Sequence, residues 1–521
     1  FSLHATYPDG SSQALFYNIA ASKCRMADES GGSHQCFTAH EACKAKVYGA
    51  RFSDSVNWYA GAQASQVEFY DLVADSSTSV GIIMTVSATE QSYCLVSDSN
   101  LVADAGGKLF GVTSGADGNG PRLIITDSLI KSSNSSPAVN KGNLTLIGNV
   151  IEVSDPNWRF DHMQGLLVLE GNRFLVGQTR DASGLIHTTE PARLEASGNF
   201  FDIAGSDFPV LTFSPGGETA QASTIRNNIF TNIAACDSIV HIDDDAMAPV
   251  IQNNVFYNPV VGGRCIVLEH DGDEPADMRL GFTNNIFYNV AEVIDAPAGA
   301  FFLAAYNCYF GGQVRTEFGS IEADPLFADA LGGDFHLLSR AGRWDRELYR
   351  AGDLNADGIC DLLDFAYFAS AWQSSGPNLP ADLNRDGQVD ALDLAVFSAK
   401  YLGDGKAGGW VYDEFTSPCI DAGNPGSPLG DELADANNVR LNIGAFGGTT
   451  EASMSPADWA LLSDATNDGI VDFADFALGI TAFPGLEHQP GDLNRDGAVD
   501  ARDLECFSED WLRQTSWYQG P

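Results

Sequence analysis

Short runs of β-branched and aromatic residues alternate with Asn, Gly and Asp between residues 120 and 310. The pattern repeats as LIGNVI, LEGNRF, ASGNFF, IRNNIF, IQNNVF, FTNNIF and AYNCYF. The aligned asparagines are Asn149, Asn172, Asn199, Asn228, Asn254, Asn285 and Asn307, at spacings of 23, 27, 29, 26, 31 and 22 residues. Such runs, bounded by turn residues and repeated about every 20–50 residues, predict the strands and turns of a solenoid.

A second column of strands lies between the asparagines, as in GLIHT, PVLTF, SIVHI, CIVLE and EVIDA. When such coils stack, like strands lie on like strands about 4.8 Å apart, with apolar side chains inside. An Asn at one turn of each coil can then bond its amide to the next coil, as in cross-β ladders. The repeats resemble the right-handed parallel β-helix of the pectate-lyase-like superfamily, which implies a mainly β solenoid.

A different pattern begins with DLNADGICDLLD, residues 353–364, where oxygen-bearing side chains occupy places 1, 3, 5, 9 and 12 and glycine occupies place 6. Calcium takes about six to eight oxygens, and a 12-residue loop supplies them from places 1, 3, 5, 7, 9 and 12, with a backbone carbonyl at place 7. The frame recurs from residues 382, 464 and 492. The predicted ligands are Asp353, Asn355, Asp357, Ile359, Asp361, Asp364, Asp382, Asn384, Asp386, Gln388, Asp390, Asp393, Asp464, Thr466, Asp468, Ile470, Asp472, Asp475, Asp492, Asn494, Asp496, Ala498, Asp500 and Asp503.

The four loops predict about four Ca²⁺ ions, one in each loop. The loop from residue 464 should be the weakest, because Thr466 stands at place 3 where the other loops have Asn. An alternative interpretation is a set of acidic turns before helices, since Asp also caps helix N-termini. Four copies in one register favour calcium over that alternative.

A short apolar run that predicts a helix follows each loop, as in DFAYFASAWQ and DLAVFSAKYL. These loop-plus-helix units resemble dockerin type I modules, in which two units pack together. The loops form two such pairs, with starts 29 and 28 residues apart. The resemblance implies calcium binding and docking onto a cohesin partner through places 10 and 11. Cellulosomal members often have Ser or Thr there, whereas this chain has Leu362, Leu363, Ala391, Leu392, Phe473, Ala474, Ala501 and Arg502.

These patterns divide the chain into five parts. They are an N-terminal cap with a cysteine cluster at 1–48, the β-helix at 49–349, a first dockerin-like pair at 350–405, the C-terminal cap of the β-helix at 406–456, and a second pair at 457–521. The stretches SIEADPLFADALGGDFHLLSRAGRW and SPCIDAGNPGSPLGDELADANNVRLNIGAFGGT resemble the closing segment of bacterial secreted β-helix proteins. Because the first pair lies between them, we expect it to be an insertion into the cap.

Charge and cysteine content indicate the setting. The net charge of −42 argues against a nucleic-acid partner, because phosphates would be repelled. No stretch approaches the roughly 20 apolar residues of a membrane span. The 10 cysteines and the calcium loops predict an extracellular or cell-surface protein of a bacterium, in an oxidising place. The chain begins at Phe1 without Met, which is consistent with a removed signal peptide.

Two disulfide predictions follow. A cysteine cluster near the N-terminus should form at least one local bridge, and the alternative is a zinc site, although the spacings fit no common zinc pattern. Its members are Cys24, Cys36 and Cys43, with His34 or His40 as further zinc ligands. A second bridge is expected between Cys308, on the last clear rung, and Cys419, in the cap.

Polar residues also align along the second strand column. The resemblance to β-helix polysaccharide lyases and hydrolases directs attention to such columns. One interpretation is a catalytic groove or a fifth metal site. The favoured one is a solvated face of an acidic solenoid, because no Lys or Arg falls inside the column; no catalytic residue is assigned, and FDHM around Asp161 and His162 is an isolated match. The aligned places hold His187, Thr212, His241, Leu268 or Glu269, and Asp295, with Asp243–Asp245 and Glu269–Glu274 beyond them.

We therefore expect a secreted, calcium-binding structural or adhesive protein that builds or joins an extracellular assembly, such as a filament. Its partner is another protein or copies of itself, and a polysaccharide is a further candidate. The alternative is a carbohydrate-active enzyme, a polysaccharide lyase or glycoside hydrolase, anchored through its dockerin-like modules. A Lys or Arg facing the acidic column would favour the enzyme.

Overall fold

The computed structural model describes residues 2–518 with interruptions. The interruptions are 5–12, 23–36, 41–43, 54–59, 64–65, 76–83, 88–92, 104–109, 114–121, 133–139, 155–159, 178–183, 190, 206–207, 216–221, 270–279, 298–299, 301, 346–351, 353, 355–359, 377–378, 380, 384–386, 402–408, 433–437 and 482–486. Cys24, Cys36 and Cys43 lie outside the described residues, so the predicted local bridge and the zinc alternative stay predictions. The chain divides into two compact units, Phe1–Ala323 with Ala482–Glu487, and Asp324–Thr481 with His488–Pro521.

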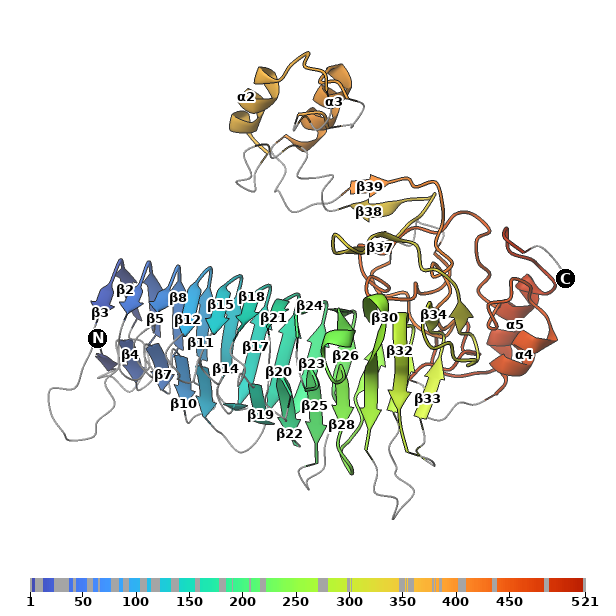
Figure 1. Cartoon of the computed structure of the whole chain (residues 1–521), viewed down its shortest axis with the longest axis horizontal. Helices are drawn as coiled ribbons and strands as arrows, with labels where there is room; N and C mark the ends of the chain where they lie inside the picture. Colours follow the sequence, from blue (N-terminus) through green and yellow to red (C-terminus); the bar gives the residue numbers. More distant parts are fainter. Residues whose placement is uncertain are drawn as a thin grey trace. The chain divides into compact units, whose positions relative to one another are not determined.

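The first unit is a solenoid of parallel strands stacked side by side (Figure 1). Its first column holds β2 (Gln13–Tyr17), β5 (Lys44–Tyr48), β8 (Gln66–Tyr70), β11 (Tyr93–Ser97), β14 (Arg122–Thr126), β17 (Asn143–Ile147), β20 (Leu166–Glu170), β23 (Arg193–Ser197), β26 (Thr224–Arg226), β29 (Val250–Gln252), β31 (Leu280–Thr283) and β33 (Phe302–Ala305). The predicted mainly β solenoid is thus confirmed, and its handedness and superfamily stay predictions.

Two further columns complete the coils. One follows the turn after the first column and holds β3 (Ala20–Ser22), β6 (Arg51–Ser53), β9 (Val73–Asp75), β12 (Asn100–Ala103), β15 (Leu129–Ser132), β18 (Val150–Val153), β21 (Arg173–Val176), β24 (Phe200–Ile203), β27 (Ile229–Thr231), β30 (Val255–Leu268), β32 (Ile286–Asp295), β34 (Cys308–Phe310) and β35 (Ile321–Glu322). The other holds β1 (Ser2–His4), β4 (Phe37–His40), β7 (Ala60–Gln63), β10 (Met84–Ser87) and β13 (Phe110–Thr113), and then β16 (Asn140–Lys141), β19 (Phe160–Gln164), β22 (Ile186–Thr189), β25 (Leu211–Ser214) and β28 (Val240–Ile242). The long strands β30 and β32 run through both columns, because β30 pairs with β27 and with β28.

On each rung, the sequence repeat builds a sharp turn directly after the strand of the first column. The residue before each ladder position has a positive φ, as at Gly171 (62°), Asn227 (57°) and Asn253 (54°). Gly and Asn tolerate this left-handed conformation better than other residues. The recurring GN and NN pairs therefore encode one turn per rung.

The asparagine after this turn forms the predicted ladder. Each side-chain amide donates to the Oδ1 of the next asparagine over 2.8–3.2 Å, without interruption from Asn149 to Asn307. The same Oδ1 also accepts a backbone N–H at 2.9–3.0 Å. Ser128 and Ser99 continue the series toward the N-terminus through their hydroxyls. Every ladder asparagine is buried, so these bonds satisfy amides that would otherwise be costly inside the coil.

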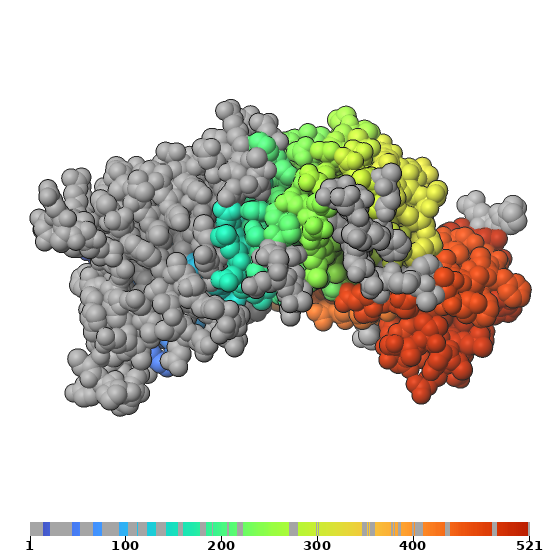
Figure 2. Space-filling model, turned by 90° about the horizontal axis from the view of Figure 1, so that it is seen from below, coloured from blue at the N-terminus to red at the C-terminus, as the bar shows by residue number. Residues whose placement is uncertain are grey.

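Aromatic rings stack along the interior beside the ladder. The rings of Phe174, Phe201, Phe230 and Phe256 lie over one another with centroids 4.5–5.3 Å apart. Alternating burial along the strands, as in β23 and β20, directs every second side chain into this core. Figure 2 shows the outer surface of the green and yellow part of the solenoid. The coil is thus a filled rod, and each rung stabilises its neighbours.

The predicted bridge between Cys308 and Cys419 is wrong. Cys308 is a buried free thiol whose Sγ donates to the carbonyl of Ala323 at 3.3 Å. Cys94, Cys236 and Cys265 are also free thiols buried in the core. The cysteine count overstated cross-linking because free Cys also serves as a small buried hydrophobic residue.

Among its described residues, the second unit combines irregular segments with short strands and four helices. A hairpin joins β36 (Phe327–Asp329) to β37 (Asp334–Leu337), and β38 (Arg343–Asp345) pairs antiparallel with β39 (Gly409–Val411). The helices are α2 (Leu362–Ser370), α3 (Ala391–Lys400), α4 (Phe473–Gly479) and α5 (Ala501–Asp510). Helices α2 and α3 share a small core around Phe368 and Phe397, and α4 and α5 lie against one around Val471 and Phe507.

Candidate metal centres

Two of the predicted calcium loops, 464–475 and 492–503, lie entirely within the described residues. The first caps the N-terminus of α4 and the second caps the N-terminus of α5. Asp464, Asp468 and Asp475 each place a carboxylate oxygen within 4.8 Å of the other two. Asp464 and Asp475 are buried while Asp468 is exposed, and in the other loop Asp492 and Asp503 are buried. The fold therefore brings places 1, 5 and 12 of the loop at 464 together around one point.

Glycine at place 6 makes this convergence sterically possible. Gly469 and Gly497 have φ values of 90° and 93°, in the region that favours glycine. Their backbone N–H groups donate to Oδ2 of Asp464 and Asp492 at 3.0 and 2.9 Å. A Cβ on Gly469 would also lie 2.9 Å from the hydroxyl of Thr515. The turn folds the loop back over its own first carboxylate.

The residues at places 9 and 12 cap the following helix in all four loops. Asp361, Asp390, Asp472 and Asp500 are N-caps, and the carboxylate three residues later accepts a bond from the backbone N–H of the cap residue. This capping box satisfies two free N–H groups of each helix. The alternative interpretation of these acidic residues as helix caps is thus confirmed for two places of each loop, and it leaves the carboxylates at places 1 and 5 unexplained.

Electrostatics distinguishes the carboxylates of the loop at 464 from simple caps. Burial raises the pKa of Asp464 to about 6, the Arg440 guanidinium lowers it, and the charge of Asp475 raises it again. Burial is also the main cause that raises the pKa of Asp475. Buried carboxylates this close repel one another unless a proton or a cation lies between them. The donor set is made of oxygens alone, which fits calcium.

Place 3 differs between the two fully described loops. The Thr466 hydroxyl donates to Oδ1 of Asp475 at 2.9 Å, so it is engaged with another predicted ligand. The Asn494 carbonyl oxygen at the same place accepts the backbone N–H of Asp496 at 2.8 Å and keeps a second lone pair. The contrast agrees with the prediction that the loop at 464 is the weaker one, which stays a prediction.

The first two loops are described in part. Asp364 and Asp393 are fully buried, and the Gly387 N–H donates to Oδ2 of Asp382 at 2.8 Å, as in the other loops. Gln388, at place 7, forms a β-bridge with Ser375. The predicted ligands that lie outside the described residues are Asp353, Asn355, Asp357, Ile359, Asn384 and Asp386.

Sequence reasoning missed the attachment of the second helix pair to the segment 409–456. Arg440 is 1 % exposed, and its guanidinium donates to the carbonyls of Asp464 and Gly423 and to Oδ1 of Asn467. Arg495 donates to the Val439 carbonyl at 2.8 Å. Asn467 and Arg495 both occupy place 4 of their loops, which has no ligand role. Because calcium binding does not require the side chain at place 4, these two polar residues could have been suspected of making another contact.

The polar column on the solenoid is largely confirmed in its register. His187, Thr212 and His241 pair in sequence across β22, β25 and β28, and Asp161 precedes them on β19. The next place holds Val267, so the prediction of Leu268 or Glu269 is wrong by one or two residues.

Beyond Val267 the column reaches Asp295, as predicted. No Lys or Arg occupies the aligned places of the column, as predicted, but Arg264 lies beside it and bridges Asp295 and Asp237 at 2.7 and 2.8 Å. The pairing of β30 with β32 shifts register between Tyr257 and Gly262.

Comparison with known proteins adds one match. Residues 351–403 match the model of the dockerin type I domain, a family of calcium-binding modules that mediate protein–protein interaction with cohesin partners in secreted extracellular proteins. No curated protein and no solved structure matches the chain. Among the described helices, none is long and apolar enough to cross a membrane.

Proposed function

We propose that the chain is a secreted structural or adhesive protein of a bacterium that joins an extracellular assembly through two calcium modules carried on a β-helix. The family match covers the first module, at 351–403. The same loop geometry supports a second module at 457–521, with about four Ca²⁺ ions in all. Place 6 glycines with positive φ, buried carboxylates and capped helices recur in both.

The proposed domain boundaries follow the strand pairing. Strands β38 and β39 pair antiparallel, with Arg343 opposite Val411 and Asp345 opposite Gly409. The first module lies in the chain between these two strands. Its two ends therefore start from neighbouring points, which is the connection expected for a domain inserted into the cap of the β-helix.

The observation that carries the docking role is the exposure of apolar side chains at places 10 and 11. Leu362, Leu363 and Leu392 are 69, 59 and 61 % exposed, and Phe473 of the second module is 74 % exposed. A small module loses hydrophobic stabilisation by leaving such residues in water, so their exposure supports an interaction site at these places. Apolar residues at these places favour a partner with an apolar surface, including a second copy of this chain.

Light scattering on the full chain tests this proposal. In calcium the protein should form assemblies, and EDTA should release single chains that keep their β circular dichroism, because backbone and asparagine hydrogen bonds hold the rungs together. Leu362→Asp combined with Leu392→Asp should weaken assembly in calcium. Leu331→Asp is the matched control, because Leu331 is 85 % exposed in the hairpin between β36 and β37. A chain that stays monomeric in calcium at every concentration would contradict self-assembly and favour the enzyme alternative.

The carbohydrate-active enzyme remains the second candidate because of Arg264. This residue faces the acidic column, as the enzyme hypothesis requires. However, its guanidinium lies between two carboxylates, which stabilise its charged form. A catalytic base must release or accept a proton near the working pH, and arginine in such a clamp does not. Arg264 therefore supports a structural role more than a catalytic one.

A further inference from the structure

A continuous chain of polar side chains crosses the outer face of the solenoid over four rungs. Nδ1 of His187 lies 3.0 Å from Oδ1 of Asp161, and Nε2 of His187 lies 2.9 Å from the Ser214 hydroxyl. Ser214 in turn donates to Oδ2 of Asp243. One hydroxyl proton serves Asp243, so it is not available to His187. The arrangement holds the Asp243 carboxylate in place rather than activating Ser214.

The chain ends in a cluster of three side chains from neighbouring rungs. Nε2 of His241 lies 3.3 Å from Oδ1 of Asp243 and 3.2 Å from Oε1 of Glu269. The three ligand atoms lie within 4.8 Å of one another. A single ring nitrogen can carry one proton, yet it faces two carboxylates. Their convergence on one nitrogen is the geometry expected around a shared cation.

We propose that His241, Asp243 and Glu269 form a site for a divalent transition metal such as Zn²⁺, separate from the calcium loops. An imidazole nitrogen with two carboxylates suits zinc and its neighbours, whereas calcium takes oxygen ligands. Three protein ligands leave a fourth position open to solvent, as in zinc sites that bind a further ligand.

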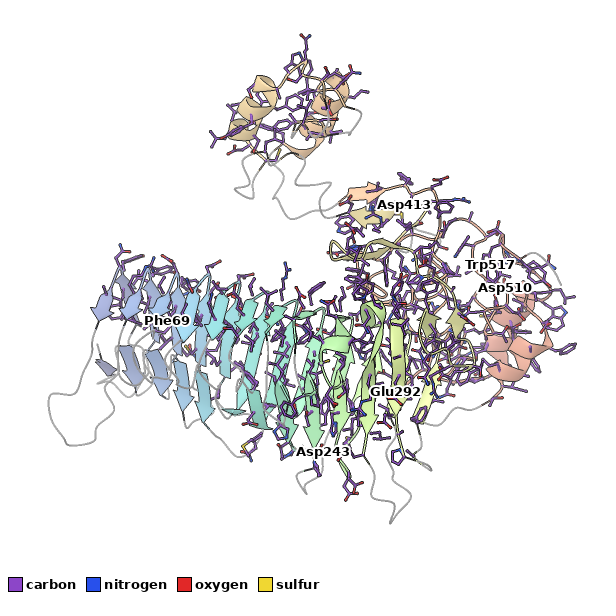
Figure 3. All side chains as sticks on the ribbon, viewed as in Figure 1. Phe69, Asp243, Glu292, Asp413, Asp510 and Trp517 are labelled. Atoms are coloured by element: carbon purple, nitrogen blue, oxygen red, sulfur yellow. The ribbon has the colours of Figure 1, made fainter. Side chains whose placement is uncertain are left out.

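The surroundings support one of the three ligands, Asp243. Outer hydrogen bonds orient a ligand and sharpen metal affinity. Here Ser214 fixes the second oxygen of Asp243, and His187 with Asp161 fixes Ser214. The cluster is open to ions, since the side chains of Asp243 and Glu269 are 34 and 56 % exposed. In Figure 3, Asp243 lies at the lower edge of the strands. Figure 2 shows the molecule from that side, with the green part of the solenoid at the surface.

The test is a Zn²⁺ titration, followed by calorimetry, of the full chain saturated with calcium. The wild type should bind one equivalent that His241→Ala abolishes, and Glu269→Gln should weaken this binding, because both remove a ligand. Ser214→Ala should reduce the affinity by about 10- to 100-fold, as loss of an outer partner does. Glu292→Gln is the matched control, because Glu292 is an exposed carboxylate on β32 of the same solenoid.

Glu269→Gln keeps the test decisive if His241→Ala misfolds, because Glu269 is mostly exposed and its loss leaves the core intact. Zinc bound by the N-terminal cysteines would survive both substitutions. The proposal is overturned if the wild type binds no zinc, or if His241→Ala and Glu269→Gln bind it as the wild type does. Either result would mean that His241, Asp243 and Glu269 contact one another without any affinity for metal.

Discussion

The helix pair at 457–521 is bound to the segment before it by a buried guanidinium, whereas the pair at 351–403 is carried between strands β38 and β39. Both pairs use the same loop, with glycine at place 6 and Asp at places 9 and 12. Among the described residues, only the second pair shows these arginine contacts. Arg440 donates to Asn467 of one loop, and Arg495 of the other loop donates to the carbonyl of Val439. The loop sequence thus determines the inside of each module, and residues outside the loop determine how firmly the module is held.

Calcium withdrawal should separate the two modules most strongly. We expect α2 and α3 to lose hydrogen-exchange protection completely in EGTA, because only a small hydrophobic core opposes the repulsion between the carboxylates of their loops. Helices α4 and α5 should retain part of their protection, since Arg440 still binds the loop at 464. Exchange measured peptide by peptide gives the comparison, and the strands of the solenoid serve as the internal control. Equal loss in both modules would show that the Arg440 contacts contribute little.

The Arg440→Met substitution should remove the difference between the modules. It leaves the carbonyls of Gly423 and Asp464 buried without their donor, and each such unsatisfied group costs about 1–3 kcal/mol. We expect this loss in the exchange free energies of α4 and α5, with α2 and α3 unchanged. Arg502→Met is the control, because Arg502 is 72 % exposed and its pairing with Asp496 is worth roughly 0–1 kcal/mol. A loss under about 1 kcal/mol in the Arg440 variant would refute the role of clamp.

The Thr466→Asn substitution should produce the smallest effect and sharpen the comparison within the second module. It gives the loop at 464 the carbonyl oxygen that its neighbour has at Asn494. We expect tighter calcium binding by a factor of about 5–10, equal to roughly 1 kcal/mol. The reciprocal Asn494→Thr should weaken the other loop by a similar factor. Calorimetric titration of both variants checks this, and unchanged affinities would mean that place 3 contributes no ligand.

The periodic features were predictable from the sequence because each repeats one local chemistry. The asparagine ladder followed from Asn at every turn, and the glycines of the loops from the need for positive φ. Ser99 and Ser128 were harder to recognise as ladder members, because a hydroxyl replaces the amide at the same turn. The polar column was misassigned at Val267, because the residue that pairs with His241 is apolar and gives the alignment no polar residue to follow.

Contacts between distant segments were not predictable in the same way. Arg440 reaches carbonyls at Gly423 and Asp464 through the fold alone, and nothing in its neighbouring residues marks it. His241, Asp243 and Glu269 were each noted, but their convergence depends on the spacing of rungs. Cys308 was assigned a partner because both positions lay near the end of the rod, although proximity in sequence order does not place two thiols together.

The asparagine ladder also makes the length of the rod adjustable. From Asn149 to Asn285 each ladder amide donates to the Oδ1 of its C-terminal neighbour, and from Asn172 to Asn307 each Oδ1 accepts from the amide of its N-terminal neighbour. Each rung thus presents the same donor on one side and the same acceptor on the other. A whole rung can be duplicated or deleted without leaving an unmatched group, whereas a partial one breaks the series. The length of the solenoid therefore changes in steps of about 4.8 Å per rung, so duplication of rungs in the gene sets the distance between segments attached at its two ends.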